Sequence, residues 1–243
     1  MEESSFSGGL LAVVALYFLF RVFRLKKRGR RASAFSKTSV EDVLMKGELG
    51  EKLVLRSLEV FEKRGARVLS NLYIPETNDE ETTEVDAVLI HRKGFFVIEV
   101  KNFNGWIFGN EKNKYWTQTL AVGRGRQSHK ERFYNPLRQN GSHIKHLKRM
   151  LSESVPMYSI IVFSDQCVLK DISVSTNKPY KIVQQHELVS LIEGIIDGEE
   201  RDIFTEQDVE WMFDELNAFA EVDDEIKRRH VEQHEKAKSE NLS

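Results

Sequence analysis

The sequence predicts an α/β domain that follows a membrane anchor. Apolar positions recur with helical spacing over residues 41–64. Two strand-like runs, residues 84–91 and 95–101, flank a tight turn that contains Lys93-Gly94. Ahead of both, residues 4–20 carry no charge and are strongly apolar from Leu10 onward. The first two features indicate a domain with helices and strands, and the third indicates a membrane-spanning helix.

Length and composition exclude several classes of protein. The chain has 243 residues, enough for one substantial domain with extensions. Hydrophobic residues make up 40% and charged residues 30%, which excludes bulk disorder. The single cysteine, Cys167, excludes an intramolecular disulfide framework and any Cys-rich zinc or iron–sulfur site. We therefore expect the domain to work in a reducing compartment.

The uncharged run has asymmetric flanks. Two glutamates precede it and seven Arg or Lys residues follow by residue 31, so residues 1–31 carry a net charge of +5 and the remainder −7. Seventeen helical residues reach about 26 Å, slightly less than a hydrocarbon core, and Arg21 and Arg24 can snorkel to lengthen the span. By the positive-inside rule, we expect a single-pass protein of the cell membrane with the bulk of the chain in the cytoplasm.

Two alternatives to a retained anchor stay open. Ala32-Ser33-Ala34 resembles a signal-peptidase site, but a basic cluster separates it from the apolar run and the N-terminus is acidic, which is unlike a signal peptide. A buried helix is the other alternative. The retained anchor explains both flanks and is preferred.

Four parts follow from the pattern along the chain. They are a membrane anchor with its basic flank at 1–31, a tether at 32–42, the α/β domain at 43–200 and a charged helical tail at 201–243. Asn135-Pro136 starts a helix that runs to about residue 151, because Asn caps free amides and Pro is tolerated in the first turn. Further helices are expected at 185–196 and from 205 onward. The predicted strands are 66–74, 84–91, 95–101, 106–108, 115–120, 157–164 and 180–183.

The hairpin brings two carboxylates together. A four-residue turn at 91–94 pairs Val88 with Val97, and the same register places Asp86 opposite Glu99. Facing carboxylates are destabilising unless a cation lies between them. Lys101, on the same strand face as Glu99, compensates in part, and a divalent metal ion is the natural occupant.

A third carboxylate, Glu51, lies in the middle of the apolar stripe of the first helix. The apolar residues of this stripe are Leu44, Gly47, Val54, Leu55, Leu58 and Phe61. A core-facing carboxylate needs an ion-pair partner or a metal. The alternative is an ordinary ion-pair cluster of Asp86, Glu99 and Lys101, with Glu51 reaching solvent.

Three segments resemble the NERD (nuclease-related) domain of the PD-(D/E)xK nuclease superfamily. They are Lys46-Gly47-Glu48-Leu49-Gly50-Glu51, Glu84-Val85-Asp86 and Val97-Ile98-Glu99-Val100-Lys101, and the resemblance covers roughly residues 43–165. Val85 replaces the Pro of the superfamily name. The resemblance implies a restriction-endonuclease-like fold, a mixed β-sheet flanked by helices, whose two motif strands carry the site.

The expected chemistry is Mg²⁺- or Mn²⁺-dependent hydrolysis of phosphodiester bonds. Asp86, Glu99 and the backbone carbonyl of Val100 are the expected metal ligands. Lys101 is expected to position the attacking water, help to deprotonate it or stabilise the developing charge. Glu51 is expected to hold a metal-bound water or a second metal.

A further candidate lies on the helix after Pro136. Asn135, Pro136 and Gln139 match an N-P-x-x-Q-like element of the family, and the resemblance implies that Gln139 contacts the active site or substrate. A capping or surface role is the alternative. His143 and His146 are expected to be solvated or phosphate-facing rather than metal ligands.

Residues 101–149 form a basic band, with eleven Lys or Arg against two Glu. Such a band favours a nucleic-acid partner, DNA more than RNA, over a merely solvated loop surface. The candidate nucleic-acid contacts are Arg124, Arg126, Lys130, Arg132 and Arg138. Five aromatic residues could stack on bases, although core or platform positions are expected for most of them: Trp106, Tyr115, Trp116, Phe133 and Tyr134.

The sequence thus predicts a membrane-anchored, metal-dependent nuclease. The alternative is a noncatalytic nucleic-acid-binding or scaffold module that retains the nuclease fold. No oligomeric state is predicted.

Overall fold

The computed structural model describes residues 38–75, 82–121, 128–175, 179–220 and 222, with side chains from residue 48 onward in the first helix. The predicted anchor at 1–31 therefore lies outside the described residues. Among the helices that the structure does describe, none combines the length and the apolar character that a membrane span requires.

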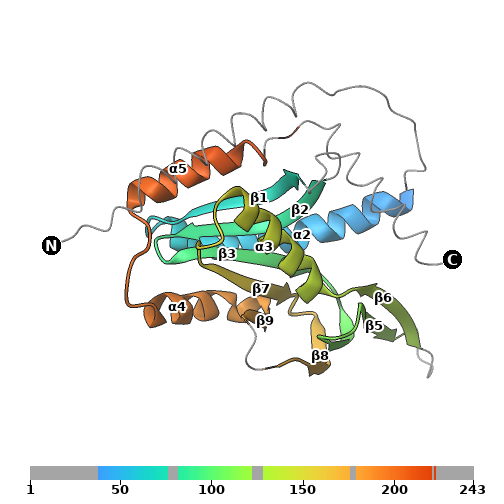
Figure 1. Cartoon of the computed structure of the whole chain (residues 1–243). Helices are drawn as coiled ribbons and strands as arrows, with labels where there is room; N and C mark the ends of the chain where they lie inside the picture. Colours follow the sequence, from blue (N-terminus) through green and yellow to red (C-terminus); the bar gives the residue numbers. More distant parts are fainter. Residues whose placement is uncertain (1–37, 76–81, 122–127, 176–178, 221, 223–243) are drawn as a thin grey trace.

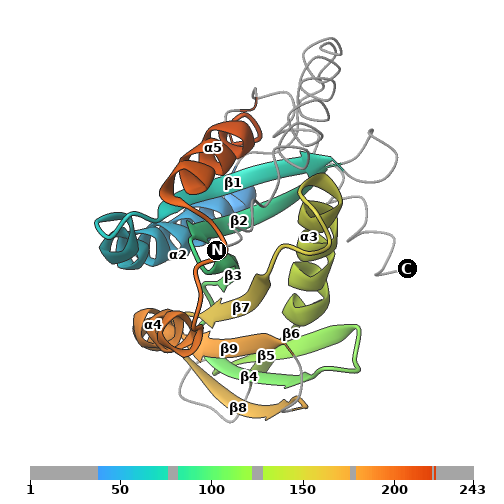
Figure 2. The same cartoon turned by 60° about the vertical axis from the view of Figure 1, so that its left-hand side comes forward.

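Two mixed β-sheets flanked by helices make up the described part of the chain (Figures 1 and 2). The larger sheet has the strand order β1-β2-β3-β7-β9, and its strands are Arg67–Pro75 (β1), Thr82–His91 (β2), Gly94–Lys101 (β3), Met157–Phe163 (β7) and Tyr180–Gln184 (β9). The smaller sheet has the order β6-β5-β4-β8, and its strands are Gly105–Asn110 (β4), Tyr115–Ala121 (β5), Ser128–Tyr134 (β6) and Cys167–Ser173 (β8). The helices are Thr38–Glu62 (α2), Pro136–Met150 (α3), Leu188–Gly198 (α4), Glu206–Asn217 (α5) and the short 3₁₀ segment Gln185–Glu187 (η1).

The predicted mixed α/β architecture is confirmed, but the expectation of one sheet is wrong. Strands β6 and β8 were not predicted. Both are short and mostly exposed, and β6 has the sequence Ser-His-Lys-Glu-Arg-Phe-Tyr. A strand with so few buried positions lacks the apolar alternation on which strand prediction depends.

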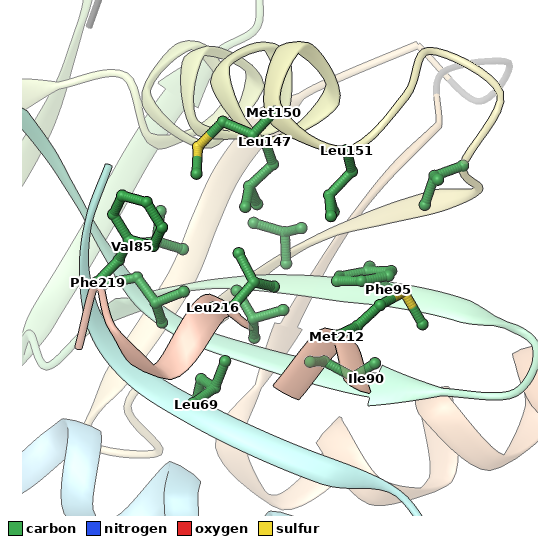
Figure 3. Close-up of a cluster of buried hydrophobic side chains, with 14 of the residues drawn as sticks. Leu69, Val85, Ile90, Phe95, Leu147, Met150, Leu151, Met212, Leu216 and Phe219 are labelled. Atoms are coloured by element: carbon green, nitrogen blue, oxygen red, sulfur yellow. The ribbon is translucent and has the colours of Figure 1, made fainter. Parts of the chain in front are cut away.

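Helices cover both faces of the five-stranded sheet. On one face, α2 and α4 pack against side chains such as Leu89 and Phe96. On the other face, α3 and α5 enclose a second core around Phe95, and Figure 3 shows Leu147 of α3 and Leu216 of α5 entering it from opposite sides. Val209 and Leu216 of α5 have no exposed surface, so this helix packs on the domain.

The helical stripe predicted for residues 41–64 is confirmed where side chains are described. Val54, Leu58 and Phe61 of α2 are all buried at 2% exposure or less. They share one apolar core with Ala87 of β2. The position of Glu51 in this helix is therefore set by the burial of the turns that follow it.

Asn135 caps α3 as predicted and also fixes where α3 begins in space. Its Oδ1 accepts from the Leu137 amide at 3.0 Å. Its Nδ2 donates to backbone oxygens in the turn between β4 and β5, at 2.7 Å for Asn113 and 3.2 Å for Glu111. Since Asn135 is itself fully buried, these bonds hold the first turn of α3 to the smaller sheet.

Candidate functional site

The predicted hairpin register is confirmed as far as the regular ladder extends. Ile90 pairs with Phe95 and Val88 with Val97, and the paired residues end at Ala87 and Ile98. The next step, a direct pairing of Asp86 with Glu99, is not among these ladder pairs. Instead the backbone amide of Val100 donates to Asp86 Oδ2 at 2.7 Å. Asp86 therefore reaches β3 through its side chain.

A break in strand alternation accompanies this contact. The register places Asn71 of β1 opposite Asp86, and the Asn71 φ of 53° lies in the left-handed region that non-glycine residues rarely adopt. Leu69 and Leu72 both enter the same core cluster, although strict alternation would place them on opposite faces. The β1–β2 ladder is thus irregular opposite the acidic position and resumes with Leu72 and Val85, and strand irregularities are common near functional sites.

Glu99 and Lys101 form a close ion pair next to Asp86. The Lys101 Nζ lies 2.5 Å from Glu99 Oε1, and the Glu99 side chain is only 1% exposed. The second oxygen, Glu99 Oε2, is buried and makes no hydrogen bond with the described residues. His143 Nε2 lies 3.7 Å from it. One edge of a buried carboxylate thus remains able to accept a further partner.

Helix α3 contributes two groups to this neighbourhood. Gln139 Oε1 accepts from Lys101 Nζ at 3.2 Å, so the structure brings Gln139 to the motif lysine. His143 and His146 are buried at 2% and 7% exposure, so the expectation that they are solvated is wrong. The reason is that α3 packs against the cores of both sheets and buries more than one of its faces, including Asn140.

Glu51 approaches the same groups from α2, on the other side of the sheet. A Cβ added at Gly50 would lie 2.5 Å from Asn102 Cβ, so α2 passes very close to the residue that follows β3. Burial raises the pKa of Glu51, and the charges of Glu84 and Glu99 raise it further, whereas Lys101 opposes them. The glycine therefore permits the close approach that places Glu51 in the field of the motif residues.

Glu84 is a member of this cluster that the sequence reasoning did not single out. Its Oε1 accepts from the Tyr73 hydroxyl at 2.7 Å. Its charge raises the pKa of both Glu51 and Glu99. The available signal was its position two residues before Asp86 in an alternating strand.

The surroundings of the cluster favour the protonated form of its carboxyl groups. Burial, followed by the charge of Glu99, raises the pKa of Asp86 well above its usual value, against the opposing effects of Lys101 and the Val100 amide. Burial also raises the pKa of Glu99, although Lys101 lowers it in part. Burial alone would lower the pKa of Lys101, but Glu99 and Asp86 reverse that effect and raise it. One lysine thus serves several carboxylates, which leaves an excess of negative charge.

The oxygen donors and the negative charge of these residues suit a divalent cation. Carboxylate oxygens are the donors that Mg²⁺ prefers, and Glu99 Oε2 is a buried oxygen without a hydrogen bond to the described residues. In the structure, Lys101 is the cation that interacts with these carboxylates. The described residues contain no group of three or more Asp, Glu, His or Cys side chains already gathered as a metal centre. We would place a cation at Asp86 and Glu99, with Glu51 nearby.

The predicted nucleic-acid contacts divide into three groups. Arg124 and Arg126 lie outside the described residues. Lys130 and Arg132 are exposed on β6, at alternate positions that share one face. Arg138 is exposed in the first turn of α3, where its Nη2 donates to the Lys112 carbonyl at 2.7 Å.

The predicted stacking residues are also separated by the structure. Trp116 is 1% exposed and stacks on Phe163 in the core between the two sheets, which is the core position expected for most of these rings. Phe133 is half-buried against the same core. By contrast, Trp106 is 51% and Tyr134 42% exposed. The alternation of β5 and β6 decides which rings face the core.

A groove between α2 and β1 lies apart from these groups. It is lined by residues that include the exposed Leu49 and Leu53 and by Val68 of β1. None of the motif carboxylates nor Lys101 lines it. The acidic cluster, and not this groove, is the candidate site.

Comparison with known proteins finds a family model and a relative, but no solved structure. The family model described as nuclease-related domain (NERD) matches residues 46–164. An uncharacterized protein of Bacillus anthracis is 32% identical over 186 residues, which cover 76% of this chain and 82% of that protein. No solved structure matches the chain.

Proposed function

Because this chain belongs to the nuclease-related domain (NERD) family, we propose that it is a metal-dependent nuclease that hydrolyses phosphodiester bonds, with DNA favoured as substrate. One observation carries the proposal. Strand β2, strand β3 and helix α2 bring Asp86, Glu99, Lys101 and Glu51 together at one end of the larger sheet, with Gln139 of α3 bonded to the lysine.

An ion-pair cluster alone accounts for this arrangement poorly. A buried ion pair is stable when charges balance and hydrogen bonds satisfy both partners. Here Lys101 faces Glu99 and Asp86 while Glu84 and Glu51 add further negative charge, and one oxygen of Glu99 stays without a hydrogen bond to the described residues. The excess of carboxylate is costly for the fold and useful for holding a cation.

The roles of the residues follow from their positions. Asp86 and Glu99 would hold Mg²⁺ or Mn²⁺, with the Val100 carbonyl and Glu51 as further candidates. A divalent cation supplies positive charge beside the phosphate and activates water near neutral pH. Lys101 has the position to orient the attacking water, since its Nζ also contacts Gln139. Hydrolysis adds that water to phosphorus and breaks a bridging P–O bond, which leaves a phosphomonoester and a hydroxyl.

We also propose that the domain is tethered to the cell membrane and faces the cytoplasm. The support is the uncharged run at residues 4–20 with acidic residues before it and basic residues after it. A reporter fused after Ser243 should lie in the cytoplasm, and the protein should resist carbonate extraction. Release into the soluble fraction with Met1 retained would contradict the anchor.

The proposed activity is tested by combining metal titration with cleavage. The 243-residue chain, held in a mild non-ionic detergent, should be stabilised thermally by Mg²⁺ or Mn²⁺, since a ligand that binds only the folded state stabilises it by mass action. The same metals should support cleavage of DNA. Asp86→Asn should abolish both effects, whereas the exposed-surface variant Lys145→Ala should abolish neither.

The contrary result is equally clear. If no divalent metal stabilises the chain and Asp86→Asn destabilises it as the loss of an ion-pair partner would, then the cluster is structural. A chain that binds nucleic acid but cleaves none with any metal would be a noncatalytic member of the family.

A further inference from the structure

The smaller sheet has one face in the core and one face in solvent. Ile107 and Trp116 point inward and join a cluster with Phe163 of β7. A Cβ at Gly109 would lie 2.3 Å from the Trp116 ring, so the inner face is tightly packed. We define the open face as the opposite side of this sheet, which carries Trp106, Tyr115, Lys130, Arg132, Tyr134 and Lys170.

The register arranges these side chains in rows across the strands. Trp106 pairs with Thr119, which pairs with Lys130. Along β5, the next position on this face is Thr117, paired with Arg132. The third row is the pair of Tyr115 and Tyr134, whose ring centroids lie 6.1 Å apart. Aromatic rings therefore lie at both ends of the face, with cations beside them.

Cations contact the aromatic rings directly. The Arg132 guanidinium lies 4.8 Å from the Tyr115 ring centroid, and Lys170 Nζ lies 5.6 Å from that of Trp106. A register shift in β8 skips Lys170 and pairs Asp171 with Phe108, which places this acidic residue on the same side. The cations outnumber it, so the face is complementary in charge to a polyanion, and its exposed rings remain unexplained by packing.

We propose that the open face binds single-stranded nucleic acid. Duplex DNA offers phosphates and base edges, whereas a single strand also offers unstacked bases whose faces lie on aromatic rings while the phosphates meet cations. Thr119 and Tyr115 are four residues apart, so the Trp106 and Tyr115 rows are separated by roughly 13–14 Å along the strands. That separation suits different bases of one strand.

The smaller sheet directly follows the motif strand β3 in the chain. Strand β4 starts at Gly105, four residues after Lys101, and the Ser164 amide donates to the Lys101 carbonyl at 3.1 Å where β7 leads into β8. Figure 2 shows the smaller sheet lying beside β7, β9 and α3. A polymer bound on the open face would therefore lie on the sheet that directly follows β3, the strand that carries Glu99 and Lys101. This inference rests on the proposed function, for which it names the substrate class.

The test measures binding without cleavage. The 243-residue chain in mild detergent and EDTA is titrated against a fluorescently labelled single-stranded DNA and against the same sequence as a duplex, with anisotropy as the readout. We expect tighter binding of the single strand. Trp106→Ala should weaken it by about 5- to 150-fold, the range for loss of one base stack, while Trp106→Phe should retain most of the affinity.

Charge is tested by salt dependence. Lys130→Glu combined with Arg132→Glu should weaken binding and reduce the slope of log K against log salt, because fewer counterions are released. Leu53→Ala and Arg56→Glu on α2 are the matched controls, since both side chains are exposed away from the open face. These controls should bind as the unmodified chain does, and circular dichroism should show all variants folded.

Three outcomes separate the possibilities. Trp106-dependent binding of the single strand without cleavage in Mg²⁺ supports the open face and contradicts the nuclease proposal. Cleavage that persists with unchanged binding in Trp106→Ala overturns the open face and leaves the nuclease proposal standing. The third outcome combines two results: phosphatidylglycerol micelles shift a tryptophan fluorescence signal that is absent in Trp106→Phe, and oligonucleotide binding does not depend on Trp106. In that case the partner is a membrane surface and the proposal is overturned.

Discussion

The two sheets differ in how far their charged and aromatic side chains are buried. In the larger sheet, Glu99 is buried and Asp86 and Lys101 are half-buried, and burial raises the pKa of both carboxylates. On the smaller sheet, Trp106 and Arg132 are left in water. Neither arrangement stabilises the fold, since burial of charge costs free energy and an exposed aromatic ring does not contribute the free energy that its burial would give. The contrast indicates that chemistry is concentrated in the first region and recognition in the second.

Substitution of Lys101 tests most directly whether cleavage and nucleic-acid binding belong to separate regions. Lys101→Ala should lower the rate of cleavage by on the order of 10²- to 10⁴-fold, the usual contribution of a group that acts on the attacking water. The chain should still bind single-stranded DNA in EDTA, and metal should still raise its melting temperature. If Lys101→Ala removes nucleic-acid binding together with cleavage, the two regions are not separate in function.

Gly50 tests whether the approach of α2 matters for the acidic site. Gly50→Ala forces a Cβ to within 2.5 Å of Asn102 and should destabilise the protein by about 1–3 kcal/mol, as overpacking does. Because α2 must move, Glu51 should move with it, and the metal concentration that gives half-maximal stabilisation should rise.

Gly194→Ala is the matched control for this substitution. Gly194 lies in α4 with no atom within 4 Å of an added Cβ, so the change should stabilise the helix by about 0.5–1 kcal/mol. Its metal response should equal that of the unmodified chain. An equal metal response in Gly50→Ala would show that Glu51 takes no part in binding.

Two substitutions at Asp86 distinguish the effect of its hydrogen bond with the Val100 amide from the effect of its negative charge. Asp86→Ala leaves the Val100 amide without its acceptor and should cost about 1–3 kcal/mol of stability in the metal-free chain. Asp86→Asn keeps an acceptor and removes the repulsion from Glu99, so its metal-free stability should equal or exceed that of the unmodified chain. Chemical denaturation in EDTA measures both. Equal destabilisation by the two variants would mean that Lys101 depends on the Asp86 charge.

The raised pKa values also predict how pH affects the acidic site. A carboxylate whose pKa is raised by folding contributes stability at low pH that is lost as the pH rises through its folded-state value. The metal requires the ionised carboxylates, so the increase in melting temperature caused by Mg²⁺ should grow as the pH rises above the ordinary range of carboxylate pKa values. Binding of single-stranded DNA in EDTA should change less. A metal effect that stays constant as the pH rises would contradict the assignment of Asp86 and Glu99 as ligands.

Much of the larger sheet could be predicted from the sequence because its signals are local. Alternation in residues 84–101 predicts both motif strands and the pairing of Val88 with Val97, which the structure confirms. Asn135-Pro136 likewise predicts the start of α3, because a cap and a fixed φ act within one turn. The family resemblance arises from the same segments.

Tertiary structure alone decided the features that depend on contacts between distant segments. The ladder of β2 with β3 ends at Ala87 and Ile98, and Asn71 of β1 has a φ of 53°, and no local sequence pattern predicts either feature. His143 is buried because α3 packs against both sheets, and Trp116 is a core residue although Trp106 is not. The physical reason is that burial is a property of the packed elements together, whereas capping, turn formation and alternation are set by neighbours along the chain.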